Sequence, residues 1–396
     1  MSDYTSRLRF SMDSVSFEDD DFMEKLLEIA HLFRPFSEAM DAFLARRGFD
    51  ASRMDVDGKT ACIRDVFLKA GMEPPREVRE WFTAGQPIRR ETAFQICFAF
   101  GLDGNETDEF FREYYARERS FNCHRVEEAV YYFCLNNGLS YGEARDIIAA
   151  VPAAEDGAKG GDQVYTASII AELNSLTTRD ELIRYLTDNR NIFTVDNVTA
   201  YAFIRRLWDS AAGPGGLLIR ERERLPSMLD DMANLKRSPV REGDAGVRPW
   251  DAYLAILQLD KQDVKRLRTD RSIQPVIERL HAGARDSFPD RQGIDLILRG
   301  KRVSYERVRK WLVLLSFYTF WARRALDRGD YAACPEDGER CVAHMDQVLT
   351  DAGYPEMYVG NPYDWIFFYA AGNDEPLPTF RYIFNELLAS ALDGHP

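Results

Sequence analysis

The residues that could bind a metal ion do not complete a recognisable site. Six cysteines stand at positions 62, 97, 123, 134, 334 and 341, and none forms a Cys-x-x-Cys pair. Cys334, Cys341 and His344 offer three of the four ligands that a structural zinc site needs, and no fourth is evident. Buried free thiols are the simpler interpretation, because free cysteine is among the most buried residue types. We therefore expect no metal and no cofactor.

Residues for nucleophilic catalysis are equally sparse. The chain has five histidines, and none stands beside a serine or cysteine in a nucleophile motif. Cys123 and His124 are adjacent, but neighbouring side chains on a helix point in different directions. The run from Gly213 to Gly216 lacks the Lys and the preceding strand of a phosphate-binding loop. We expect a protein that is not an enzyme; a nuclease of unfamiliar arrangement is the alternative.

Basic residues are the strongest indication of a partner. Residues 261–324 hold 16 Lys or Arg and 7 Asp or Glu, a net charge of +9, whereas the rest of the chain carries −23. Basic side chains on one surface neutralise phosphates and release counter-ions. We therefore predict nucleic-acid contacts at the residues that cluster around Gly300: Arg299, Lys301, Arg302, Arg307 and Lys310. The expected partner is double-stranded DNA. The alternatives are a solvated helix surface and docking on the acidic N-terminal part of the same chain.

The spacing of apolar residues predicts helices along most of the chain. They cover residues 22–33, 36–44, 60–70, 89–100, 125–134, 140–149, 167–174, 178–186 and 197–208, and resume from Trp250. Ser140 with Glu143 forms a capping box, and Asn105 is the expected N-cap of another helix. Alternating patterns that would build a sheet are missing from the sequence. The predicted fold is all-α.

Two segments with the composition of linkers suggest the domain organisation. Small residues and mixed charge at 151–162 and at 238–248 are typical of linkers or exposed loops. We expect two or three packed helical domains with helix-turn-helix-like units: an N-terminal domain over 1–150, a middle helical segment over 163–237, and a C-terminal domain over 249–396 that carries the basic segment. Aromatic residues are dense between positions 354 and 384, and we assign them to a core.

The turn at Gly85 and the ending Ala99-Phe100-Gly101-Leu102 carry a family resemblance. Residues 60–111 resemble the λ-repressor-like (Xre-type) helix-turn-helix proteins. The resemblance implies a groove-entering helix at 75–84. It also implies DNA contacts by the arginines in and after that helix: Arg76, Arg79, Arg89 and Arg90.

A second, similar pattern of a helix, a Gly-Lys turn and a capped helix spans residues 288–309. Residues 61–116 carry a net charge of −3, which opposes binding to phosphates. The basic segment is therefore the stronger candidate for the nucleic-acid interface.

Function and location follow from these patterns. The first 21 residues are polar, so we expect no signal peptide. The longest apolar stretch, residues 311–322, is too short for the roughly 20 residues of a membrane-spanning helix. We expect a cytoplasmic protein without a membrane partner. The leading hypothesis is a helical regulatory protein of bacterial or mobile-element type that binds nucleic acid. The alternative is a non-enzymatic adaptor that binds a protein partner through its acidic N-terminal half; the oligomeric state is open.

Overall fold

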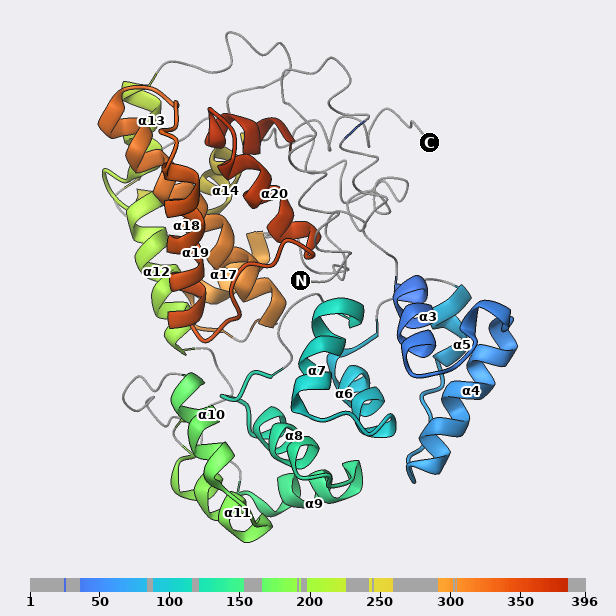
Figure 1. The fold of residues 1–396 in the computed structure, drawn as a ribbon. Helices are drawn as coiled ribbons and strands as arrows, with labels where there is room; N and C mark the ends of the chain where they lie inside the picture. Colours follow the sequence, from blue (N-terminus) through green and yellow to red (C-terminus); the bar gives the residue numbers. More distant parts are fainter. Residues whose placement is uncertain are drawn as a thin grey trace. The chain divides into compact units, whose positions relative to one another are not determined.

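The part of the chain that its computed structural model describes is mostly helical. That part is residues 25, 36–83, 88–115, 121–152, 166–190, 192–193, 198–225, 242–243, 246–258, 291–301, 303 and 305–383. It contains sixteen α-helices and one short β-hairpin. Figure 1 shows the helices, coloured along the sequence. The predicted all-α, multi-helix fold is confirmed. The chain divides into two compact units, residues 34–198 and the residues from 199 onward, and each is described by itself.

The first unit, residues 34–198, consists of nine described helices. They are α3 (Phe36–Arg46), α4 (Val56–Lys69), α5 (Val78–Thr83), α6 (Arg90–Ala99), α7 (Gly104–Phe110), α8 (Val126–Asn136), α9 (Tyr141–Ala150), α10 (Thr166–Ser175) and α11 (Arg179–Asp188). A 3-10 turn, Ala51–Arg53, lies between α3 and α4, and α7 continues into a π-helical turn, Phe111–Tyr115. The predicted helix at 22–33 lies outside the described residues, apart from Lys25.

Side-chain caps begin several helices of this unit. The Ser140 hydroxyl accepts a hydrogen bond from the Glu143 N–H at the start of α9, so the predicted capping box is confirmed. The expectation for Asn105 is wrong, because Asn105 lies inside α7. Asp103 is the N-cap there, and its carboxylate accepts a hydrogen bond of 2.8 Å from the Glu106 N–H.

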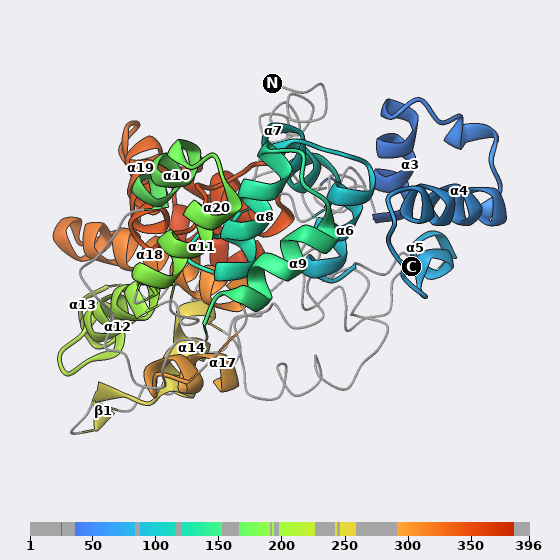
Figure 2. The ribbon, with the colours of Figure 1, turned by 90° about the horizontal axis from the view of Figure 1, so that it is seen from below.

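Aromatic rings fill much of the core of the first unit. Phe43 of α3 makes an edge-to-face contact with Phe110 at a centroid distance of 4.8 Å, and Phe94 of α6 packs on Phe111 at the same distance. Helix α8 lies beside α9 (Figure 2). The short helix α5 buries Trp81. Helices α3 to α7 thus surround one apolar core.

The second unit, from residue 199 onward, has seven described helices. They are α12 (Val198–Ala212), α13 (Leu217–Arg224), α14 (Pro249–Leu257), α17 (Arg291–Leu298), α18 (Tyr305–Arg328), α19 (Asp337–Asp351) and α20 (Pro362–Ala371). Strands β1 (Glu242–Gly243) and β2 (Gly246–Val247) pair as an antiparallel hairpin.

Helix α18 is the central element of the second unit. Its 24 residues pack against α13 and α19, and the predicted core helix at 311–322 lies within it. Trp311, Leu315 and Phe317 are fully buried there. Among the described helices, none combines the length and the apolarity needed to span a bilayer. The dense aromatic residues after Tyr354 also belong largely to this core.

The division into two units differs from the predicted middle segment, residues 163–237. Ile169 of α10 and Leu182 of α11 are buried in the core of the first unit. Ile204 of α12 and Leu218 of α13 are buried in the core of the second. The helices of the predicted middle segment are therefore shared between the two cores.

Candidate nucleic-acid interface

The turn that follows α17, at residues 299–301, has a defined backbone conformation. Gly300 adopts a φ of 66°, in the left-handed region that glycine occupies without strain. The Gly300 N–H donates to the Ile297 carbonyl at 2.9 Å, and the Lys301 N–H donates to the Leu296 carbonyl at 2.8 Å. These two bonds form the Schellman arrangement that ends many helices. The positions of Arg299 and Lys301 on either side of the glycine are therefore set by the backbone.

Helix α12, which lies about 100 residues earlier in the sequence, contacts Lys301 and Val303. The Tyr201 hydroxyl donates to the Lys301 carbonyl at 2.9 Å and accepts from the Val303 N–H at 3.1 Å. Arg205 follows one helical turn after Tyr201. A Cβ atom on Gly300 would lie 3.2 Å from Nη2 of Arg205, so the guanidinium reaches the glycine itself.

Three exposed basic side chains consequently gather at this turn. Arg205, Arg299 and Lys301 are all exposed, and we call these three residues the basic turn. Arg206, the next residue on α12, is also exposed, and its guanidinium lies 4.3 Å from the centre of the Phe203 ring. Sequence reasoning missed Arg205 because α12 lies far from the basic segment along the chain, and only the fold brings it to this turn.

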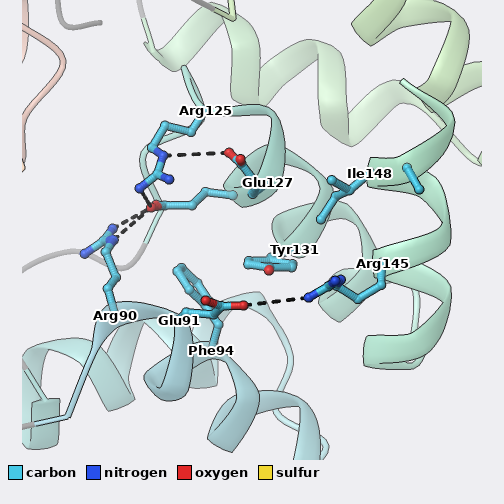
Figure 3. A pocket seen from close by; sticks show the side chains of 10 residues that line it. Arg90, Glu91, Phe94, Arg125, Glu127, Tyr131, Arg145 and Ile148 are labelled. Carbon is cyan, nitrogen blue, oxygen red and sulfur yellow. Dashed lines mark hydrogen bonds and ion pairs between the residues drawn. The ribbon is translucent and has the colours of Figure 1, made fainter. Parts of the chain in front are cut away.

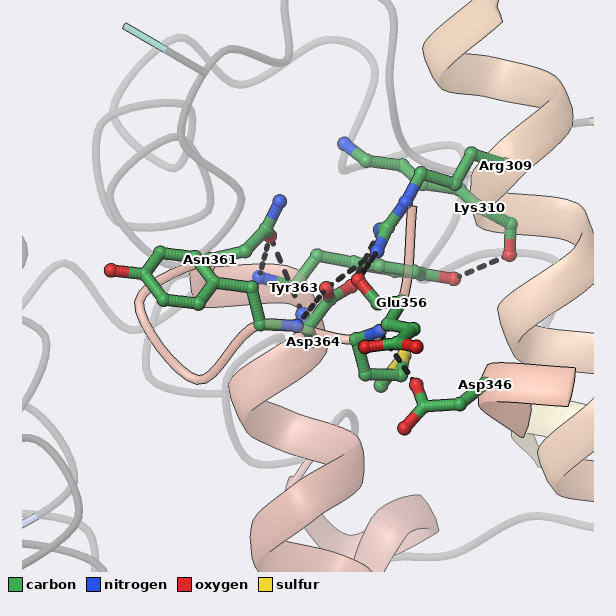
Figure 4. Close-up of polar contacts among 9 residues, drawn as sticks. Arg309, Lys310, Asp346, Glu356, Asn361, Tyr363 and Asp364 are labelled. Carbon is green, nitrogen blue, oxygen red and sulfur yellow. Dashed lines mark hydrogen bonds and ion pairs between the residues drawn. The ribbon is translucent and has the colours of Figure 1, made fainter. Parts of the chain in front are cut away.

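The other predicted members of the cluster have different surroundings. Arg302 lies outside the described residues, and Arg307 is half-buried. The Lys310 side chain is only 7% exposed, and its ammonium lies 5.2 Å from the centre of the Tyr363 ring (Figure 4). The Tyr363 hydroxyl donates to the Lys310 carbonyl at 2.9 Å. Lys310 is thus part of the packing between α18 and α20.

Arg309, the neighbour of Lys310, forms a buried ion pair. Its two terminal nitrogens donate to the two carboxylate oxygens of Asp364 at 2.7 Å each (Figure 4). The side chains of the two residues are 3% and 0% exposed. Asp364 also accepts a hydrogen bond from the Tyr358 N–H. The charge of Arg309 is therefore neutralised by Asp364 in the interior of the protein, and the exposed net charge of the basic segment is smaller than +9.

The arginines implied by the helix-turn-helix resemblance lie in the first unit. Arg76 and Arg89 are exposed. Arg79, in the short helix α5, forms an exposed ion pair with Asp57 of α4. Glu80 is exposed next to Arg79 on the same helix. The surface of α5 therefore presents both signs of charge.

Arg90 lies in a cleft between α6, α8 and α9 (Figure 3). Its guanidinium donates two hydrogen bonds of 2.9 Å to the carboxylate of Glu128, which is 4% exposed. Arg125 reaches the same carboxylate at 3.5 Å. The cleft, of about 360 Å³, is lined by equal numbers of arginines and glutamates, so its charges balance. The contacts of Arg90 join α6 to α8.

The residues considered for zinc do not converge. Cys341 is buried, its sulfur lies 3.8 Å from that of Met345, and burial raises the pKa of its thiol. The His344 ring stacks on Phe320, and burial lowers its pKa. Cys334 is exposed. Within the described residues, no group of three or more potential ligands could hold a metal ion.

Comparison of this chain with known proteins finds no similar sequence or structure. Neither a protein family, nor a curated protein, nor a solved structure matches this chain.

Proposed function

We propose that this chain is a helical regulatory protein that binds nucleic acid, and that the basic turn contacts the phosphates. The observation that carries the proposal is the geometry of Arg205, Arg299 and Lys301. Two helices and a Schellman turn bring these exposed cations together on a backbone that hydrogen bonds already hold. A preformed site of this kind binds without the entropic cost of ordering a loop.

The electrostatics of the two units favour this location over α5 and the residues that follow it. Arg79 is already paired with a carboxylate, and Arg90 is largely buried against Glu128. Arg76 and Arg89 are exposed, but the acidic Glu80 is exposed in the same segment, whereas the basic turn consists of three exposed cations. Contacts to phosphates fix orientation and register without reading bases. The proposal therefore concerns phosphate binding and leaves sequence recognition to other residues.

The test is a titration of labelled duplex DNA with the full-length protein over a range of salt concentrations. Each phosphate contact contributes about 0.9 to the slope of log affinity against log salt. We expect Arg299→Ala and Lys301→Ala each to reduce that slope by about 0.9 and to weaken binding at low salt. Arg205→Ala should have the same effect, because its guanidinium lies at the same turn.

The matched control is Arg340→Ala. Arg340 is an exposed arginine of the second unit that pairs with Glu336 on its own helix, away from the basic turn. Its removal should leave both the affinity and the slope unchanged. Equal losses in all four variants would indicate unspecific attraction. Negligible binding of duplex DNA at low salt would contradict the proposal. It would favour the alternative function, an adaptor that binds a protein partner through the acidic N-terminal half of the chain.

A further inference from the structure

A groove in the second unit lies between α19 and the C-terminal end of α20, which are neighbours in Figure 1. Its volume is about 670 Å³, within the range of roughly 300–1,000 Å³ typical of small-molecule sites. One wall is a single face of α19. The opposite wall includes Phe368 and Ala371 of α20, and Cys334 lies at one end. None of these residues belongs to the basic turn.

The face of α19 alternates charged and apolar side chains. It contributes Glu339, Val342, Ala343 and Asp346, which share one side of the helix because they are three, four and seven residues apart. The backbone positions of the two acidic residues are about 10.5 Å apart along the helix axis, at about 1.5 Å per residue. The apolar side chains of Val342 and Ala343 lie between them.

The charge of the lining has one sign. Glu339, Asp346 and Asp374 line the groove, and none of its described lining residues is Lys, Arg or His. Glu339 and Asp374 are exposed, whereas Asp346 is half-buried. An anion would be repelled from this lining. A small hydrated metal ion could not bridge carboxylates so far apart, and it would gain nothing from the apolar wall.

Asp346 adds a reason for a cation to bind. Burial, together with the nearby carboxylates of Glu356 and Asp364, raises its pKa. A hydrogen bond from the Met357 N–H, 2.7 Å from Oδ1, and the charge of Arg309 act in the opposite direction. A positive group in the groove would stabilise the ionised carboxylate and would itself be stabilised.

We propose that this groove binds a linear aliphatic polyamine. The two outer ammonium groups pair with Glu339 and Asp346, and the methylene chain between them covers Val342 and Ala343. Asp374, on the opposite wall, offers a third carboxylate. A polyamine is the occupant because it separates its charges by apolar segments, as the groove separates its carboxylates. This proposal is independent of the nucleic-acid site.

The first experiment is calorimetric titration of the full-length protein with spermidine, 1,4-diaminobutane and butylamine at constant ionic strength. We expect affinity to fall in that order, because each step removes one ammonium group that can pair with a carboxylate of the groove. Magnesium chloride at the same ionic strength should not displace spermidine. Equal affinity for all three amines, or displacement by magnesium, would mean that the acidic surface attracts any cation, and would overturn the proposal.

A second readout uses the thiol of Cys334, which is exposed at the groove. Saturating spermidine should slow the reaction of Cys334 with a thiol reagent severalfold. Cys62, which lies in the first unit and is half-buried, serves as the internal control and should react at an unchanged rate. Cys334→Ser identifies the protected thiol by removing it. Unchanged reactivity of Cys334 would contradict binding in the groove.

Carboxylate variants test the contacts themselves. Glu339→Gln and Asp346→Asn should each weaken spermidine binding by about threefold, as expected for partly solvated ion pairs. Together they should weaken it by about tenfold. The matched control is Glu336→Gln, because Glu336 is an exposed acid near the start of the same helix that does not line the groove. An equal loss in this control would overturn the assignment.

Val342→Lys provides a test that keeps both carboxylates. The new ammonium would lie between Glu339 and Asp346 and occupy the middle of the groove. Spermidine binding should be lost while the circular dichroism of the protein stays unchanged. Retained binding by the folded variant would show that the amine binds elsewhere.

Discussion

Glu181 illustrates how much of this fold depends on single residues at helix ends. It is the N3 residue of α11, and its carboxylate accepts hydrogen bonds from the Thr177 and Thr178 N–H groups at 2.9 and 3.0 Å. These bonds, with those from the two hydroxyls, lower the pKa of Glu181 to about 2. The ionised carboxylate of Glu181 therefore stabilises the N-terminal end of α11, although the side chain lies at the surface.

The first prediction follows from this pKa. Because the pKa is lower in the folded chain than the ordinary value of 4.5, ionised Glu181 stabilises the fold above about pH 4.5, and this contribution is lost as the pH falls towards 2. An NMR titration of the Glu181 side chain should give a midpoint near 2. In Glu181→Gln the corresponding part of the pH dependence of urea unfolding should disappear. A midpoint near 4.5 would contradict the capping contacts.

The N-caps of α9 and α7 differ in how well the sequence predicts them. Ser140 and Glu143 were recognisable because the pattern is local and no other cap competes. At α7 both Asp103 and Asn105 are suitable cap residues. The Gly104 N–H donates to the Asn136 amide oxygen of α8 at 3.1 Å, and a Cβ at Gly104 would lie 2.5 Å from that oxygen. The helix that begins after Asp103 thus also makes a contact with α8 at Gly104. The local sequence around Asp103 and Asn105 does not reveal this contact.

At the scale of elements, α18 shows why the spacing of charges identified only some of the exposed basic residues. The helix is buried on most of its sides. Arg309 and Lys310 therefore turn inward, where α20 supplies Asp364 and Tyr363 more than fifty residues later in the chain. The sequence identified the basic cluster, but the direction of each side chain depends on which helix packs beside it. Arg205 lies beside Gly300 for the same reason.

The second prediction concerns the ion pair between α18 and α20. Asp364→Asn keeps an oxygen that can accept from the Tyr358 N–H but removes the charge that compensates Arg309. Leaving one partner of a buried ion pair without its counter-charge costs about 3–5 kcal/mol. Urea unfolding should show a free energy of unfolding lower by that amount. Arg340→Ala, which breaks an exposed pair on α19, should change it by less than about 1 kcal/mol.

At the scale of the whole molecule, composition predicted more than one packed core but not where they divide. The soft stretch at 151–162 suggested a boundary, yet such stretches also occur within a single domain. Beyond it, Leu173 of α10 and Leu186 of α11 are buried in the first core. The Tyr132 hydroxyl of α8 donates to the Asn174 side chain of α10 at 2.8 Å. Tertiary contacts such as these, and not the composition of the sequence, assign α10 and α11 to the first unit.

The third prediction is that residues 34–198 fold when expressed alone, whereas a fragment that ends at residue 152 is impaired. The shorter fragment lacks α10 and α11, and so loses the buried side chains of Ile169, Leu173, Leu182 and Leu186. Burial of one such side chain contributes about 1.5–3 kcal/mol, so the free energy of unfolding should fall by at least about 3 kcal/mol. Urea unfolding followed by circular dichroism measures it, and a dye for apolar surfaces should bind the shorter fragment more. Equal stability of the two fragments would place the boundary near residue 150, where the composition suggested it, and would make α10 and α11 dispensable for the first core.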